Sequence, residues 1–163
     1  MIVKEEITTM EQQHHMSNGA IINRFTHVCK GAFIGENVMI GQGCYIASKA
    51  IIGRETRIQN NVSIWNGVEI GSRVFVGPNV TFTNHHDPSD RFKRDEFKED
   101  KTIIGDGATI CAAAVIIAPC NLDSDCMIAA GSVVLRDIEK NEKVKGLVPK
   151  LKYNGHWCRN PDA

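Results

Sequence analysis

A six-residue period runs through most of this 163-residue chain and limits its possible folds more than any other feature. From residue 16 to residue 134 the same position of each hexad is apolar, with one interruption between residues 82 and 104. The position four residues further on is usually small or β-branched, and glycine often follows the apolar position. The eighteen apolar positions are Met16, Ile22, Val28, Ile34, Ile40, Ile46, Ile52, Ile58, Ile64, Ile70, Val76, Phe82, Ile104, Ile110, Ile116, Leu122, Ile128 and Val134.

A period of six matches neither the 3.6-residue period of an α-helix nor the two-residue alternation of a flat strand. It matches a coil with three short sides, each ending in a tight turn where glycine or asparagine relieves backbone strain. Three hexads make one coil, so the eighteen hexads predict about six coils. With stacked strands about 4.8 Å apart, such a prism is roughly 25–30 Å long.

This pattern resembles the hexapeptide-repeat family, whose fold is a left-handed parallel β-helix. We therefore expect an all-β chain of about six coils, with one excursion loop and a C-terminal extension. Residues 1–15 are predicted to be an N-terminal lead-in, residues 16–139 the β-helix, and residues 140–163 a basic extension. The charged segment 88–103 interrupts the repeat, and a long excursion from a rigid solenoid is usually functional.

Charge and composition exclude several classes of partner. The chain has 19 basic and 19 acidic side chains, and this neutrality argues against nucleic acid or an anionic membrane as the main partner. No apolar run is long enough to span a bilayer, and residues 1–15 lack the apolar core of a signal peptide. We therefore expect a cytoplasmic protein whose six cysteines are reduced, with Cys44, Cys120 and Cys126 at the small inward position of the hexad.

Residues 58–92 resemble, more narrowly, the hexapeptide acyltransferases that N-acetylate nucleotide-linked 3-amino sugars. The resemblance rests on the QNNV hexad at residues 59–62, on Gly77-Pro78, on the FTN sequence at residues 82–84 and on Pro88-Ser89. It implies an acyl-CoA-dependent acyltransferase that moves acetyl from acetyl-CoA to a sugar amine during glycan or surface-polysaccharide precursor synthesis. Family members work as homotrimers with active sites between neighbouring prisms, so we expect a homotrimer.

The resemblance also implies where acetyl-CoA lies. In these enzymes the pantetheine arm runs along the prism, held by backbone N–H groups of small residues on successive coils. Ala112 and Ala130 are 18 residues apart and so occupy equivalent positions, where a free N–H can bind the thioester oxygen as negative charge develops. The family's closing motif corresponds here to residues 146–150, which assigns Pro149 and Lys150 to CoA, with Lys150 or Lys152 near a phosphate. No metal is expected, because the chain has no closely spaced cysteine pair of the zinc-binding type.

Acyl transfer also needs a group that takes the acceptor's proton, and neutral histidine is the natural base near pH 7. His85 and His86 follow Asn84 at the mouth of the excursion, and the resemblance assigns all three to catalysis. In O-acetyltransferases of this fold a histidine near this point is the base, whereas several amino-sugar N-acetyltransferases have none there. Arg91 and Arg94 are predicted to bind a diphosphate or carboxylate of the acceptor, together with Asn84.

The favoured function is therefore an acetyl-CoA-dependent N-acetyltransferase acting on a nucleotide-linked amino sugar, and three alternatives stay open. The first is a sugar O-acetyltransferase of the same fold with His85 as base. The second is a γ-class carbonic anhydrase, which needs three zinc-binding histidines; here Trp65 stands at the first ligand position, and no histidine occurs from Asp87 to Gly155. The third is a non-catalytic scaffold or binding module.

Overall fold

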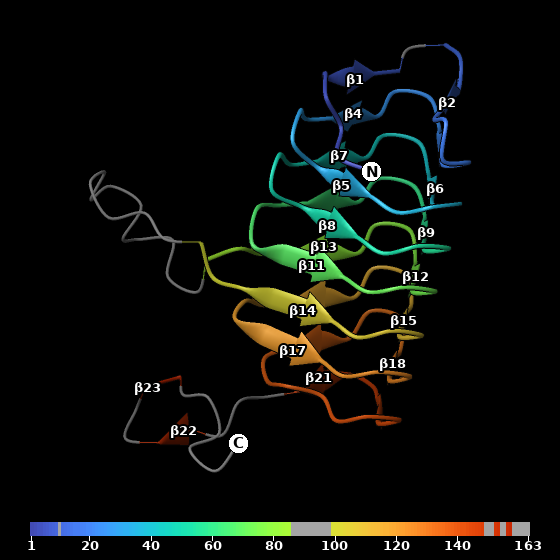
Figure 1. Cartoon of the computed structure of the whole chain (residues 1–163). Coiled ribbons are helices and arrows are strands. Elements are labelled where there is room, and N and C mark those ends of the chain that lie inside the picture. The colour runs from blue at the N-terminus through green and yellow to red at the C-terminus, as the bar shows by residue number, and fades with distance from the viewer. Residues whose placement is uncertain (10, 86–98, 149–151, 154–155, 158–163) are drawn as a thin grey trace, which may run out of the picture.

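The computed structural model describes residues 1–9, 11–85, 99–148, 152–153 and 156–157. Within these ranges the chain forms strands and turns, and it has no helix of the length and apolar character that crossing a bilayer requires. Successive strands fall on three sheets in turn, so the chain winds into a three-sided prism (Figure 1). The strands at the front of this view run to the right as the chain descends, which is the sense of a left-handed coil. The predicted fold class is confirmed.

Each side of the prism is one sheet. Sheet A contains β5 (Phe33–Ile34), β8 (Ile51–Ile52), β11 (Val68–Ile70), β14 (Thr102–Ile104) and β17 (Cys120–Leu122). Sheet B contains β1 (Ile7–Thr8), β4 (His27–Val28), β7 (Tyr45–Ile46), β10 (Ser63–Ile64), β13 (Thr81–Phe82), β16 (Val115–Ile116), β19 (Val133–Val134) and β21 (Leu147–Val148). Sheet C contains β2 (His14–His15), β3 (Ile21–Ile22), β6 (Met39–Ile40), β9 (Arg57–Ile58), β12 (Phe75–Val76), β15 (Thr109–Ile110), β18 (Met127–Ile128) and β20 (Lys143–Val144). Strands β22 (Lys152–Tyr153) and β23 (His156–Trp157) form a separate antiparallel pair.

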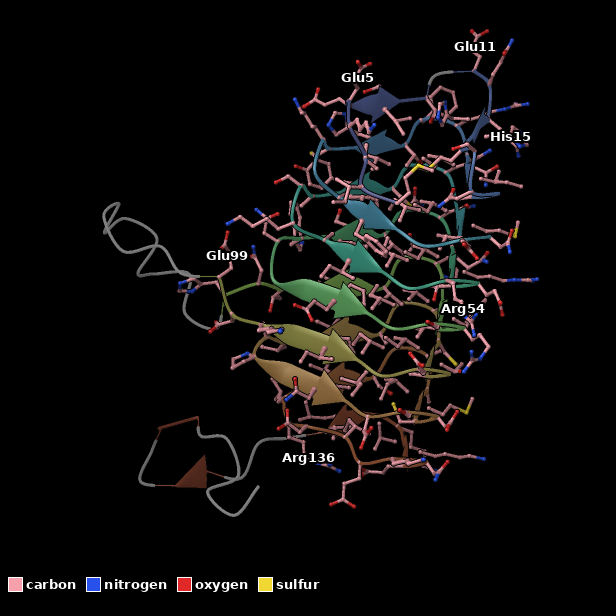
Figure 2. The ribbon with its side chains drawn as sticks, viewed as in Figure 1. Glu5, Glu11, His15, Arg54, Glu99 and Arg136 are labelled. Carbon is pink, nitrogen blue, oxygen red and sulfur yellow. The ribbon has the colours of Figure 1, made fainter. Side chains whose placement is uncertain are left out.

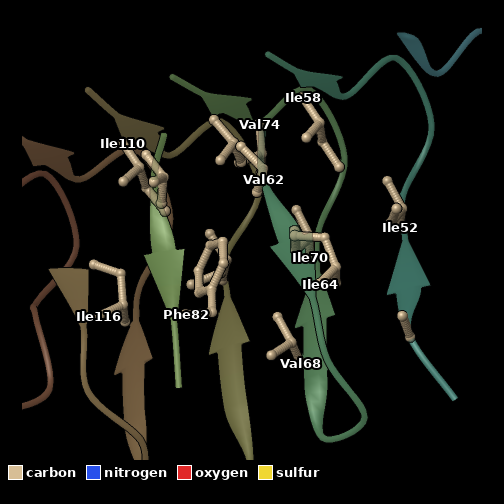
Figure 3. Close-up of a cluster of buried hydrophobic side chains, with 14 of the residues drawn as sticks. Ile52, Ile58, Val62, Ile64, Val68, Ile70, Val74, Phe82, Ile110 and Ile116 are labelled. Atoms are coloured by element: carbon tan, nitrogen blue, oxygen red, sulfur yellow. The ribbon is translucent and has the colours of Figure 1, made fainter. Parts of the chain in front are cut away.

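The predicted apolar column forms the core of the prism. Seventeen of the eighteen hexad positions are buried, and Met16 packs half-buried against the others. The small or β-branched residues four positions further on are buried as well. Figure 3 shows Ile58, Ile64 and Ile70, one from each sheet, pointing into the same interior. Each fully buried isoleucine contributes about 1.5–3 kcal/mol relative to an exposed one, so the repeated column supplies the main stabilisation of the fold.

Asparagine adopts left-handed backbone in the turns, as expected. The glycines that directly follow the inward position do not, and they are needed for another reason. Asn37 and Asn61 adopt left-handed backbone, with φ of 55° and 59°, three residues after the inward position. Gly53, directly after an inward residue, is not among the residues with positive φ. A Cβ at Gly53 would lie 2.6 Å from the carbonyl oxygen of Gly71 on the next coil. Glycine is therefore needed here because the neighbouring backbone lies so close.

The coil continues beyond residue 139, where we expected the extension to begin. Strand β20 pairs in parallel with β18, and β21 pairs with β19. The inward residues Val134, Ile138, Val144 and Val148 are spaced four, six and four residues apart, whereas every earlier side except the one with the excursion has six. The last coil is thus shorter, and its inward residues do not follow the six-residue spacing. For this reason the sequence period did not predict it.

The repeat also resumes inside the segment 88–103 that we expected to be excursion loop. Strand β14 begins at Thr102 and pairs with β11 in the register Val68↔Thr102. Thr102 is buried, and its N–H donates to the carbonyl oxygen of Gly67 at 2.9 Å. Thr102 therefore already belongs to the core, although it is polar and so escaped the apolar pattern.

Residues 1–9 and 11–15 cap the N-terminal end of the prism. Strand β1 runs antiparallel to β4 on sheet B, β2 runs antiparallel to β3 on sheet C, and Ile2 bridges Phe33 on sheet A. The hydroxyl of Thr9, a buried residue, donates to the carbonyl oxygen of Asn23 at 2.6 Å. The lead-in thus pairs with the free edge of all three sheets.

We predict that Gly53→Ala destabilises the protein by about 1–3 kcal/mol, because the added methyl group must push two coils apart. The melting temperature should fall by roughly 3–10 °C in a thermal unfolding experiment followed by circular dichroism. Gly131→Ala is the control, since a Cβ there has nothing within 4 Å and Ala113 already adopts φ 57° at the equivalent corner. Its loss should be about 1 kcal/mol, from the left-handed backbone alone. Equal losses in the two variants would contradict this account of Gly53.

Candidate functional site

The three corners of the prism carry different groups. We name them by the sheets that they join: the B–A, A–C and C–B corners, in the order in which the chain turns from one sheet to the next. The excursion leaves the prism at the B–A corner, between β13 and β14. Ala112 and Ala130 lie at the C–B corner, each between a strand of sheet C and the next strand of sheet B. The predicted catalytic and donor residues therefore occupy two different edges.

The mouth of the excursion is fixed to the coils around it. Thr83, Asn84 and His85 are half-buried and directly follow the buried Phe82. The N–H of Ala118, on the next coil, donates to Oγ1 of Thr83 at 2.8 Å. The N–H of Asp100 donates to the carbonyl oxygen of Asn84 at 2.9 Å, which joins the two ends of the excursion. His85 thus starts from a backbone position held by the core of the prism.

The other residues of the predicted site lie outside the described part of the chain. They are His86, Arg91, Arg94, Pro149 and Lys150. Their roles in catalysis, acceptor binding and CoA binding stay predictions.

At the C–B corner, Ala112 and Ala130 stand one above the other as the repeat predicted. The strands on either side pair in the registers Thr109↔Met127 and Val115↔Val133, and the N–H of Gly131 donates to the carbonyl oxygen of Ala112 at 2.9 Å. Ala112 is half-buried and Ala130 is exposed.

The N–H groups of these two alanines have no hydrogen-bond acceptor among the described residues. At the same corner of an earlier coil the N–H of Gln42 donates to Oδ1 of Asn60 at 2.9 Å. Below Ala112 the stacked residue is Ala130, whose side chain has no acceptor. The small side chains that open this edge therefore also leave two donors available, stacked one coil apart.

Within one chain the two halves of the candidate site are far apart. Asn84 and His85 lie at one end of sheet B, and Ala112 and Ala130 lie at the other. A side of three or more extended residues spans about 10 Å or more, whereas a general base must come within about 3 Å of the proton that it takes. The donors at one corner and the histidine at the other therefore cannot act on one reacting centre within a single prism.

The cysteines at the inward position have the predicted environment. Cys44, Cys120 and Cys126 are buried, and the cysteines of the described ranges are free thiols. Burial, with a smaller contribution from Asp123, raises the pKa of Cys126 to about 11, and burial also raises the pKa of Cys44. A thiol that stays protonated is a poor nucleophile, so these residues act as compact core side chains.

The described residues contain no group of three or more histidine, cysteine, aspartate or glutamate side chains placed to hold a metal ion. A groove of about 360 Å³ lies on sheet C, between Met39 and Phe75 and beside Arg57 and Arg73. Sheet C is the side of the prism opposite the B–A corner, so this groove does not adjoin Asn84 and His85.

Sequence reasoning missed a column of aromatic rings on sheet B. The rings of His27 and Tyr45 stack with centroids 5.6 Å apart and planes 8° apart, and the ring centroid of Trp65 lies 5.3 Å from that of Tyr45. Residues 27 and 45 are one coil apart at the same outward position, so the 18-residue spacing was the signal available in the sequence.

Two family models match the repeats of this chain. Residues 49–84 match the model described as bacterial transferase hexapeptide (six repeats), and residues 31–66 match the hexapeptide repeat of succinyl-transferase. Residues 31–84 are therefore hexapeptide repeats of the transferase type, and the recognition of this repeat family is confirmed.

Solved structures with the same fold include three acetyltransferases. The perosamine N-acetyltransferase PerB from Caulobacter crescentus, solved with CoA and GDP-perosamine, is 20% identical with a TM-score of 0.66, over 78% of this chain and 54% of that one. The acetyltransferase domain of PglB from Neisseria gonorrhoeae is 16% identical with a TM-score of 0.66, over 78% and 54%. A hexapeptide-repeat acetyltransferase from Vibrio cholerae, solved with acetyl-CoA, is 25% identical with a TM-score of 0.62, over 71% and 66%. The chain thus spans about half the length of PerB.

Proposed function

We propose that this hexapeptide-repeat chain is an acetyl-CoA-dependent N-acetyltransferase that acts on a nucleotide-linked amino sugar. The observation that carries the proposal is the stacked pair of unpaired N–H groups at Ala112 and Ala130. Structures of similar fold were solved with CoA and GDP-perosamine or with acetyl-CoA, which supports this donor and this class of acceptor. We extend the proposal to a 3-amino sugar, to glycan or surface-polysaccharide precursor synthesis, and to a cytoplasmic location.

Acetyl-CoA supplies the thioester, and the residues of the C–B corner fit an extended arm that carries it. The side chains of Ala112 and Ala130 are methyl groups, so a ligand can lie close to the backbone there. A backbone N–H aimed at the thioester oxygen stabilises the negative charge that develops there as the amine attacks. In this proposal, His85 of a neighbouring copy accepts the proton that the amine loses as the C–N bond forms and the C–S bond breaks, and CoA leaves as the thiolate. Asn84 orients the acceptor beside His85.

We further propose a homotrimer, because the B–A corner of one copy must meet the C–B corner of the next to complete the site. The outer faces of the prism support such packing. Large apolar side chains, each about 40% exposed, recur at outward positions along two sheets: Phe33, Ile51 and Ile103 on sheet A, and Met39, Phe75 and Met127 on sheet C. Rows of this kind are typical of surfaces that other chains cover.

The trimer is tested by the mass of the protein in solution. We expect sedimentation equilibrium to give about three times the chain mass of 18.0 kDa. A monomer that keeps full acetyltransferase activity would contradict a site shared between chains.

The position of the donor is tested by Ala130→Leu. Because Ala130 is exposed, the fold should accept leucine, while the longer side chain obstructs the edge where acetyl-CoA is proposed to lie. We expect the affinity for acetyl-CoA, measured by calorimetry, to fall at least about 10-fold, the size of effect expected when an added side chain overfills a close contact. Ser124→Leu is the matched control, since Ser124 is at the A–C corner of the same coil. A folded Ala130→Leu variant that binds acetyl-CoA normally would place the donor elsewhere.

The acceptor chemistry is tested by His85→Asn. A free amine is itself nucleophilic, so N-acetylation should fall only modestly and should still rise with pH as the amine loses its proton. A sugar hydroxyl needs a base in the transition state, so O-acetylation should fall by roughly 10²–10⁴-fold at every pH. The assay compares His85→Asn and His86→Asn on nucleotide-linked amino sugars and on simple glycosides. Efficient acetylation of glycosides alone would favour the O-acetyltransferase alternative.

A further inference from the structure

We infer that the B–A corner, on the N-terminal side of His85, is a subsite for a diphosphate-linked sugar, in which Trp65 contacts the sugar ring and Lys49 and Lys30 bind the diphosphate. The inference rests on the proposed function and names the residues that select its acceptor. None of these three residues belongs to the site predicted from the sequence.

The position of Trp65 relative to the excursion is set by the strand register. Ser63 pairs with Thr81, so Trp65 lies one coil before Thr83, and Asn66 lies one coil before Asn84. One coil corresponds to about 4.8 Å along the prism. Lys49 lies one coil further toward the N-terminus at the same corner, and its N–H donates to Oδ1 of Asn66 at 3.0 Å. A ligand that extends from His85 toward the N-terminal end of this edge therefore passes Trp65 and then Lys49.

The indole of Trp65 is held in place and is still accessible. Its ring lies against Tyr45, which stacks on His27, and the hydroxyl of Tyr45 lies 3.3 Å from Sγ of Cys29. Nδ1 of His27 in turn lies 2.8 Å from Oγ1 of Thr8. Trp65 ends this column and remains 38% exposed. A large, flat ring whose orientation is fixed by a stack offers an apolar surface for a ligand ring at little cost in side-chain entropy.

The same corner carries positive charge at the spacing that a diphosphate needs. Lys49 and Lys30 are both exposed, and they lie on consecutive coils of this corner. Lys49 contacts Glu99 at 3.6 Å, but its side chain is 71% exposed, and an ion pair of this kind contributes little. Figure 2 shows Glu99 at the edge where the excursion meets the prism. A diphosphate can therefore displace Glu99 from Lys49 at small cost.

The charged residues of this corner differ between its N-terminal and C-terminal parts. From Lys49 to Asn84 is about two coils, or roughly 10 Å, which suits the distance from a diphosphate across one sugar ring to its amine. Further along the same corner the positive charge is already neutralised, because Arg136 binds Glu142 with N–O distances of 2.6 and 3.2 Å. The bound sugar nucleotide therefore has its diphosphate toward the N-terminal end of the corner and its reactive amine toward His85.

The experiment measures the KM for UDP- and GDP-linked amino sugars and, separately, for acetyl-CoA. Trp65→Ala should raise the KM for the sugar nucleotide about 10-fold, as expected for loss of one ring contact, and leave the KM for acetyl-CoA unchanged. Trp65→Phe should restore most of the loss. Phe25→Ala is the control, because Phe25 is an exposed aromatic residue that lies at the C–B corner of the first coil, away from Trp65 and outside the apolar rows of sheets A and C. Lys49→Ala should raise the acceptor KM roughly 3- to 10-fold, as expected for loss of one hydrogen bond at a solvent-exposed site. Glu99→Gln should lower the acceptor KM or leave it unchanged, since Glu99 competes for Lys49.

Binding is also measured without acetyl-CoA, so that it does not depend on turnover. The chain has two tryptophans, and in a Trp157→Phe background Trp65 is the single tryptophan, whose fluorescence can be excited selectively. UDP-linked amino sugar should change its emission, and inorganic diphosphate should compete in wild type but less in Lys49→Ala. Binding that needs Trp65 and Lys49 in a protein that acetylates no sugar would refute the proposed function and support the subsite.

Three results would overturn the subsite. The first is acetylation of a sugar nucleotide with an unchanged acceptor KM in Trp65→Ala, which leaves the proposed function intact. The second is an equal loss in Phe25→Ala. The third is a fall in solution mass in Trp65→Ala, because Trp65 would then hold copies of the chain together rather than bind the acceptor.

Discussion

The whole structure depends on backbone hydrogen bonds that join each coil to the next, in an 18-residue register that changes only at the excursion and at the last coil. The bonds continue through the corners: the N–H of Asn61 donates to the carbonyl oxygen of Gln42, and the N–H of Asn79 donates to that of Asn60. Every coil must therefore have almost the same outline as its neighbours, and the inward column of isoleucine and valine fills a section of constant size. This constraint is why Gly53 cannot carry a side chain, and why a long insertion is possible only where its two ends meet again, as Asn84 and Asp100 do.

The same constraint decides where chemistry is possible. Side chains at inward positions pack in the core. Side chains at outward positions on the flat sides lie directly beside those of the neighbouring coils. The corners are the places where a side chain or a backbone N–H reaches away from both sheets. The donors at Ala112 and Ala130, the histidine at the mouth of the excursion and the aromatic column ending at Trp65 all lie at or beside corners. Because two different corners are involved, the proposed site needs the corners of two neighbouring prisms.

The sequence was sufficient for the parts of the fold that repeat. Apart from the excursion, the column from Ile22 to Val134 repeats every six residues, so the core, the coils that this column spans and the stacking of Ala112 on Ala130 could all be predicted. The last coil could not, because two of its sides have four residues and Val148 falls out of phase. Thr102 was missed for a related reason: a buried hydroxyl does not count in a pattern of apolar residues.

The candidate site was less accessible to sequence reasoning. A resemblance pointed to Asn84 and His85, but hydrogen bonding at the corners depends on what lies one coil away. Gln42 and Ala112 both precede a left-handed corner residue, yet only the first has an acceptor beneath it, Oδ1 of Asn60. Likewise, Trp65 is two residues beyond the outward position that His27 and Tyr45 share, so the column forms because a large ring reaches back from the corner. Such contacts can be recognised only in the three-dimensional structure.

The antiparallel lead-in has a consequence for how a protein of this design changes in length during evolution. A parallel stack would otherwise end in three open strand edges, and a further coil or another molecule could add to them. Because β1, β2 and Ile2 pair antiparallel with those edges, a further coil cannot continue the parallel stack at the N-terminal end. Duplication of 18 residues inside the stack keeps the register on both sides of the insertion. The number of coils between the lead-in and the excursion can therefore vary by whole duplications, while the edge that carries Asn84 and His85 remains unchanged.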